Sequence, residues 1–86
     1  MHNKKYKLDS IKEFGWHNRL YDELTPDAVY YLAYLKPGER GWILWENDSF
    51  GMPHRIHTSV IADVEYADRA VIVRTQNTMF TFVEVE

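Results

Sequence analysis

Residues 55–66 alternate almost without interruption between apolar and polar side chains, and this feature constrains the fold more than any other. One set is Ile56, Thr58, Val60, Ala62, Val64 and Tyr66; the other is Arg55, His57, Ser59, Ile61, Asp63 and Glu65. Successive side chains of a β-strand point to opposite faces, so the alternation predicts one long strand whose first set faces a core. A strand of 12 residues is long, and we expect it to bend and serve both halves of a rolled sheet.

Further strands are expected on both sides of this segment. The Ala67-Asp68 pair predicts a tight turn into a strand at 70–73, and Gln76-Asn77 predicts a second turn into a strand at 79–85. The segment 42–45 carries large side chains on both faces and is expected to add another strand. Together they predict a small curved antiparallel sheet of about four strands, as a meander, a half-barrel or an SH3-like barrel.

The N-terminal third is expected to be helical. Thr25-Pro26-Asp27 is typical of a helix start, and apolar residues then recur at helical spacing up to Pro37 and Gly38, which predicts a helix over 26–36. A weaker helix is expected to begin at Asp9-Ser10 and to carry Ile11, Phe14 and Leu20. The fold class predicted from these patterns is α+β, with a helical N-terminal third followed by the curved sheet.

Length and charge predict one domain with a basic start. The chain of 86 residues is expected to form a single domain over 1–86. Residues 1–12 carry Lys4, Lys5, Lys7 and Lys12 against Asp9, a net +3, whereas residues 13–86 carry six bases and twelve acids, a net −6. Segment 1–8 is therefore expected to be a flexible basic arm in front of an acidic body.

The acidic body narrows the partners that we expect. Nucleic-acid binders rely on Lys and Arg to neutralise phosphates, so direct nucleic-acid binding is not expected. A protein partner is favoured instead, in particular a basic nucleic-acid-handling protein, because opposite charge would steer the encounter. No apolar run approaches the ~20 residues that span a bilayer, and the start Met1-His2-Asn3-Lys4-Lys5 is not that of a secretory signal. We therefore expect a cytoplasmic protein that does not contact membranes.

No pattern in the sequence predicts an enzyme. There is no cysteine, and His54 and His57 lie three positions apart with no acid within four residues to complete a metal site. His57 and Ser59 would share one face of a strand, but their side chains would run parallel rather than converge. Neither a nucleophile elbow nor a glycine-rich phosphate loop is present. We expect no metal, no cofactor and no catalytic residue.

The aromatic residues and a polar group define two candidate binding surfaces. Aromatic side chains are enriched at binding hot spots, and the candidate contact patch for a protein partner consists of Tyr30, Tyr34, Trp45 and Phe50. The same aromatics could instead belong to the core. The alternative function is a small barrel that binds a nucleotide or oligonucleotide, using Arg55, His57, Ser59 and Arg74.

Two short stretches carry a resemblance to known proteins. Residues 56–60 read Ile-His-Thr-Ser-Val, and residues 73–80 read Val-Arg-Thr-Gln-Asn-Thr-Met-Phe. This pattern resembles small β-rich accessory proteins of phages and prophages, and the positions that match are Thr58, Ser59, Thr75, Asn77, Thr78 and Phe80. The resemblance covers about 25 residues in and around these two stretches. It implies an accessory protein of a mobile element that binds and modulates a host protein, including as an inhibitor of host defence, and it implies no catalytic residue.

The strand patterns also predict a core and a self-association surface. The residues expected to be buried are Leu32, Leu35, Val60, Val64, Val71, Val73 and Phe82. The last strand is apolar on both faces, with Met79, Val83 and Val85 on one and Phe80 and Phe82 on the other. Because a small domain has one interior, the second face predicts a homodimer. The alternative is that a rolled sheet encloses both faces by itself.

Overall fold

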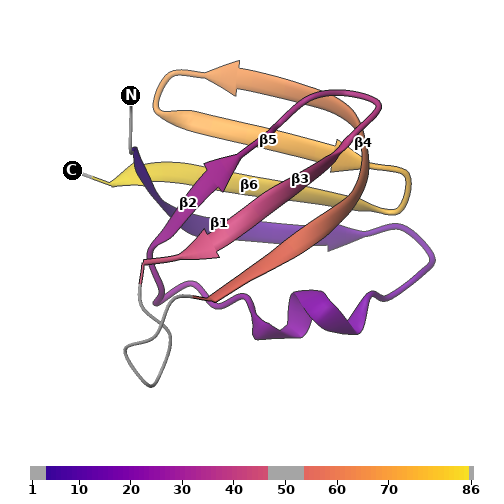
Figure 1. Ribbon diagram of the computed structural model, residues 1–86, viewed down its shortest axis with the longest axis horizontal. Coiled ribbons are helices and arrows are strands. Elements are labelled where there is room, and N and C mark those ends of the chain that lie inside the picture. Colours follow the sequence, from indigo (N-terminus) through magenta and orange to yellow (C-terminus); the bar gives the residue numbers. More distant parts are fainter. Residues whose placement is uncertain (1–3, 47–53, 86) are drawn as a thin grey trace.

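The protein forms a six-stranded closed barrel. The computed structural model describes residues 4–46 and 54–85. Its strands are β1 (Lys5–Glu13), β2 (Tyr30–Ala33), β3 (Arg40–Trp45), β4 (His54–Ala67), β5 (Ala70–Thr75) and β6 (Thr78–Val85). Each strand pairs antiparallel with the next, and β6 pairs with β1 to close the barrel (Figure 1).

The expected α+β fold, with a helical N-terminal third, is wrong. The described residues contain no α-helix; a short 3-10 helix, η1 (Arg19–Glu23), is the helical element. The segment from Asp9 that was expected to be helical belongs to β1, and most of 26–36 forms a turn followed by β2. A Pro-Asp pair favours a tight turn as readily as a helix start, and the Tyr and Leu residues after it pair with β3.

The start of the chain is also different from the expected arm. Lys5, Tyr6, Lys7 and Leu8 pair with residues 82–85 of β6, so segment 1–8 is part of the barrel from Lys5 onward rather than a flexible basic arm. Residues 1–3 lie outside the described residues. Leu8 is buried in the core, which holds this end of β1 in place.

Strand β4 bends and serves both halves of the barrel, as predicted. Its first half pairs with β3 and its second half with β5 (Figure 1). The pairing shifts by one residue in each half, because β4 has one extra residue at each point. After each shift, the next side chain that faces the interior lies three positions further along β4 instead of two. The inward residues are therefore Ile56, Thr58, Ile61 and Val64, and Val60 is 52% exposed. The predicted burial of Val60 is wrong for this reason.

At the first of these shifts, some backbone groups of β3 and β4 no longer pair between the strands, and side chains form hydrogen bonds with them instead. The Thr58 hydroxyl accepts the Gly41 backbone N–H at 2.8 Å and donates to the Ser59 carbonyl oxygen at 2.7 Å. The Tyr21 hydroxyl accepts the Ser59 backbone N–H at 2.9 Å. A buried polar group without a hydrogen-bond partner costs about 1–3 kcal/mol, so these contacts offset the free-energy cost of the bend.

The barrel interior holds one apolar core. Phe80 and Phe82 are fully buried, and Val71 and Val73 beside them are 3% and 1% exposed, which confirms the predicted burial of Val71, Val73 and Phe82. The remaining predicted core residues are partly buried and pack against this core: Leu32, Leu35 and Val64. The two faces of β6 separate as predicted, because Val83 lies on the outer side and is 39% exposed.

Helix η1 covers one end of the barrel (Figure 1). Its Tyr21 is 3% exposed and packs edge to face on Phe80, with ring centroids 4.7 Å apart. Asn18 caps the helix by accepting the Leu20 N–H at 3.0 Å. Leu24, just after the helix, is buried in the same core, and η1 corresponds to neither of the two expected helices.

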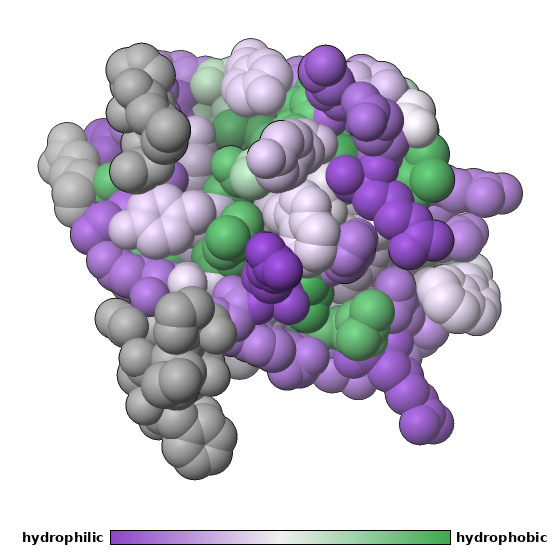
Figure 2. Space-filling view, viewed as in Figure 1, coloured by the Kyte–Doolittle hydropathy of each residue, from purple (hydrophilic) through white to green (hydrophobic). Residues whose placement is uncertain are grey.

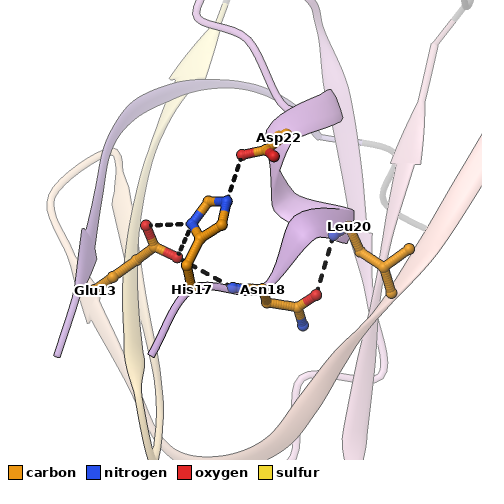
Figure 3. A network of polar contacts seen from close by, with 5 residues as sticks. All are labelled: Glu13, His17, Asn18, Leu20 and Asp22. Carbon is orange, nitrogen blue, oxygen red and sulfur yellow. Dashed lines mark hydrogen bonds and ion pairs between the residues drawn. The ribbon is translucent and has the colours of Figure 1, made fainter. Parts of the chain in front are cut away.

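A histidine between two carboxylates ties η1 to the end of β1 (Figure 3). The His17 Nδ1 lies 2.7 Å from a carboxylate oxygen of Glu13, and its Nε2 lies 2.9 Å from a carboxylate oxygen of Asp22. Hydrogen bonds to Glu13, followed by those to Asp22, raise the pKa of His17 above its usual 6.5. The doubly protonated ring donates to both carboxylates at once.

Candidate binding groove

A groove of about 960 Å³ opens on the barrel wall where β1 meets β2. This volume lies within the range of typical ligand sites. Strands β1 to β5, the loop after β2 and Lys4 line it, with the residues Lys4, Tyr6, Tyr31, Leu32, Ala33, Tyr34, Leu35, Leu44, Tyr66 and Val71. We call this feature the tyrosine groove, because four of these residues are tyrosines.

The groove forms because few residues pair between β1 and β2. In the described residues β1 pairs with β2 through Tyr6 and Tyr30 alone, whereas β1 pairs with β6 along most of its length. Side chains from the interior, such as Leu32 and Val71, therefore meet side chains from the outer face, such as Leu44, in one hollow.

Two of the tyrosines project into solvent. Tyr34 is 74% exposed and Tyr66 is 69% exposed, so neither gains much from folding. Tyr34 also has a positive φ of 58°, a conformation that is unfavourable for a bulky residue. Strained and exposed aromatic residues are concentrated at binding sites, which makes Tyr34 a strong candidate for contact with a ligand.

The groove is almost uncharged. Among the described lining residues Lys4 carries the charge, and its ammonium lies 3.9 Å from the Glu84 carboxylate. Burial raises the pKa of the Tyr6 phenol, and the nearby Glu84 and Tyr66 raise it further. Tyr6 therefore stays a neutral phenol at physiological pH and keeps its O–H donor.

The structure separates the four residues of the expected aromatic patch. Tyr30 is fully buried, and its hydroxyl accepts the Thr25 N–H at 2.7 Å and donates to the Thr25 carbonyl. Trp45 is 8% exposed and packs on Tyr30 with ring centroids 5.2 Å apart. Tyr34 lines the tyrosine groove, while Phe50 lies outside the described residues. Tyr30 and Trp45 therefore serve the core, and Tyr34 alone reaches the candidate site.

The four residues of the alternative ligand site do not converge either. Arg55 and His57 share the outer face of β4, where both contact Trp42. Ser59 lies at the bend and is held by Tyr21. Arg74 lies on β5, where its guanidinium binds Asp63 at 2.8 Å and Glu65 at 3.2 Å. Arg55 and His57 remain a pair, and the other two residues have structural roles.

The two histidines of β4 lie on opposite sides of the sheet. His54 packs on the inward-facing Trp45 and reaches Glu23 at 3.1 Å, whereas His57 packs on the outward-facing Trp42. Within residues 4–46 and 54–85 no group of three or more His, Asp or Glu side chains is placed to hold a metal ion.

Sequence reasoning missed most of the groove. Tyr6 and Tyr31 lie in segments that were expected to be an arm and a helix, and Tyr66 was expected to face the core. The one usable signal was the alternation of residues 6, 8 and 11 and of 30 and 32, which follows the strand pattern once Asp9 is recognised as an extra residue in β1.

Comparison with family models, curated proteins and solved structures finds no match to this chain. In the part of the chain that the structure describes, no helix has the length and apolar character needed to cross a membrane.

Proposed function

We propose that the protein is a small, non-enzymatic binding module that holds an extended apolar segment of a partner protein in the tyrosine groove. The observation that carries this proposal is the convergence of Tyr6, Tyr31, Tyr34 and Tyr66 from β1, β2, the following loop and β4. Tyrosine offers a large, amphipathic contact area at low conformational cost, which is why it is enriched at protein interfaces.

The shape and chemistry of the groove favour an extended peptide. Grooves lined by aromatic side chains accept proline-rich segments, whose backbone is already ordered before binding. The hydroxyls of the exposed Tyr34 and Tyr66 can donate to peptide carbonyl groups that proline leaves free. No serine, histidine or carboxylate appears among the described residues that line the groove, and this composition favours binding over catalysis.

The charge of the chain favours a partner with basic flanks. The net charge is −3, so a basic partner such as a nucleic-acid-handling protein would be steered toward this module. Its association rate would then fall as salt is added, while the dissociation rate would depend on the tyrosine contacts.

The test is a selection from a random peptide display library on the folded protein. Recovered peptides are then measured by isothermal titration against wild type, Tyr34→Ala, Tyr66→Ala and the double variant. We expect apolar, proline-containing peptides, and each single variant should weaken them by about 1–2 kcal/mol, because exposed hot-spot tyrosines contribute about that much. Both positions are exposed, so both variants should keep the wild-type melting temperature.

Phe14→Ala is the matched control, because Phe14 is an aromatic residue with 57% exposure that does not line the groove. It should leave peptide affinity unchanged. If the selected peptides bind the double variant as tightly as wild type, the groove is not their site and the proposal fails.

A further inference from the structure

The described strands of one half of the barrel carry no acidic side chain. Strands β2 and β3 and residues 54–60 of β4 contain no Asp or Glu, and their outer face carries Arg40, Arg55 and His57. The remainder of β4 carries Asp63 and Glu65, so the acids of this strand are confined to the other half-sheet. An acidic protein thus presents one locally basic face.

Aromatic and basic side chains meet on the outside of this half-sheet. Trp42 on β3 lies opposite His57 on β4, and their ring centroids are 3.7 Å apart. The Arg55 guanidinium carbon lies 4.7 Å from the centroid of the Trp42 ring. In Figure 2 the face over β2 and β3 shows apolar and weakly polar side chains with strongly hydrophilic ones between them.

The stacked arrangement leaves the hydrogen-bonding edge of Arg55 available. Stacking uses the flat face of a guanidinium, whereas its five N–H donors lie in the plane and fit a phosphate in bidentate geometry. In the described residues Arg55 contacts no carboxylate, in contrast to Arg74, which binds both Asp63 and Glu65. The ring also holds the long Arg55 side chain in place, so less conformational entropy is lost when a ligand binds.

Net charge does not oppose an anion at this face. Exposed charges are screened beyond about 8 Å at physiological salt, so the groups on the face itself decide its potential. Of the carboxylates that flank these strands, Glu46 pairs with Lys5 at 2.7 Å, and Glu39 directly precedes Arg40 in the sequence. The sequence-based expectation against nucleic acid used the net charge of −6 summed over residues 13–86, which does not describe this local distribution.

We propose that the outer face of β3 and β4 binds single-stranded nucleic acid, with phosphates at Arg55 and Arg40 and a base stacked on the cluster of Trp42, Arg55 and His57. Single-strand binders combine basic side chains along the backbone with aromatic platforms for the bases, and small antiparallel barrels present such platforms on a sheet surface. The inference rests on side chains other than those of the tyrosine groove, so it stands or fails separately from the peptide proposal.

The experiment is fluorescence anisotropy of a labelled oligothymidylate of about 12 nucleotides, a length within the usual range of single-strand sites. The full chain is titrated in low-salt buffer as wild type, Arg55→Ala, Arg55→Lys and Arg74→Ala. We expect wild type to bind, Arg55→Ala to lose about tenfold or more in affinity, and Arg55→Lys to lie between them. Arg74→Ala is the matched control, an arginine on the opposite half-sheet with both carboxylate partners, and should bind like wild type.

Titrations at several salt concentrations and with a DNA duplex distinguish recognition of a single strand from simple attraction to a polyanion. Two phosphate contacts predict a log–log salt slope of about −1.4, and Arg55→Ala should reduce it by about 0.7. The duplex of the same length should bind more weakly, because its bases are not free to stack. The proposal is overturned if wild type does not bind at low salt, if Arg74→Ala weakens binding as much as Arg55→Ala, or if the duplex binds equally well.

Discussion

At the scale of single residues, Tyr21 joins three elements of the molecule. Its ring packs on Phe80 of β6, its hydroxyl accepts the Ser59 N–H of β4, and its backbone belongs to η1. A tyrosine can do this because one side chain carries both a large apolar ring and a polar tip. The sequence offered no sign of this role, since Tyr21 lies in a segment without clear periodicity.

The neighbours Val60 and Ile61 test the shifted register of β4 directly. Val60 is 52% exposed and Ile61 is 1% exposed, the reverse of the simple alternation. We expect Ile61→Ala to lower the free energy of unfolding by about 2–5 kcal/mol through lost burial and a residual cavity. Val60→Ala should change it by less than about 0.5 kcal/mol, as is usual for a surface position.

Urea denaturation of the two variants measures both changes in the free energy of unfolding. The two values can be compared when the unfolding free energy of each variant depends on urea concentration with the same slope. A larger loss for Val60→Ala than for Ile61→Ala would show that β4 keeps strict alternation and that its bend lies elsewhere.

At the scale of elements, β3 to β6 were predictable, since the segment 42–45 was also expected to be a strand, whereas β1 and β2 were not. The turns at 67–69 and 76–77 joined long alternating segments, so β4, β5 and β6 followed from a period of two. The segment 26–36 carries turn formers that also start and stop helices, and β2 within it is four residues long. Local preference cannot identify so short a strand, because its stability comes from pairing with β3.

The contact between β1 and η1 through His17 predicts a pH dependence of stability. The folded-state pKa of His17 is raised, so its stabilising effect is fully present below the unfolded value of 6.5 and is lost as the pH rises through the folded value. We expect the melting temperature of wild type to exceed that of His17→Gln at about pH 5.5 and the difference to shrink by about pH 8.5, where an ordinary histidine is neutral.

Thermal denaturation at both pH values, followed by far-UV circular dichroism, measures this difference. His57→Gln serves as the control, because His57 contacts Trp42 and no carboxylate in the described residues. A difference for His17→Gln that grows with rising pH would contradict the assigned contacts with Glu13 and Asp22.

At the scale of the whole molecule, closure of the barrel changes how the apolar residues are distributed. The sequence predicted a curved sheet with an uncovered face, and the barrel encloses Phe80 and Phe82 while Val83 stays on the outer side. The candidate site could not be predicted for the same reason. The tyrosine groove exists because residues 6, 31, 34 and 66 meet at the seam of a closed barrel, and such a meeting depends on long-range pairing that no local pattern reports.

Self-association through β6 stays a prediction, and Val83 is its test. Val83 is 39% exposed on the outer face, where it lies opposite Ala70 of β5 and Lys7 of β1. We expect light scattering at micromolar concentration to give twice the chain mass of 10.3 kDa and Val83→Glu to give a folded monomer. A wild-type mass of one chain across the concentration range would contradict the homodimer.

The pairing of β1 with β6 has a consequence for how the protein is made. A ribosome releases β1 first, yet the long partner of β1 is the last strand of the barrel. Until β6 has emerged, the apolar side of β1 and the inner faces of β3 to β5 are not enclosed, so these strands expose apolar side chains to solvent. Folding must then wait for a contact between distant parts of the chain, which makes it slower than local turn formation. We therefore expect molecular chaperones to engage this small protein during translation and to release it once the barrel closes.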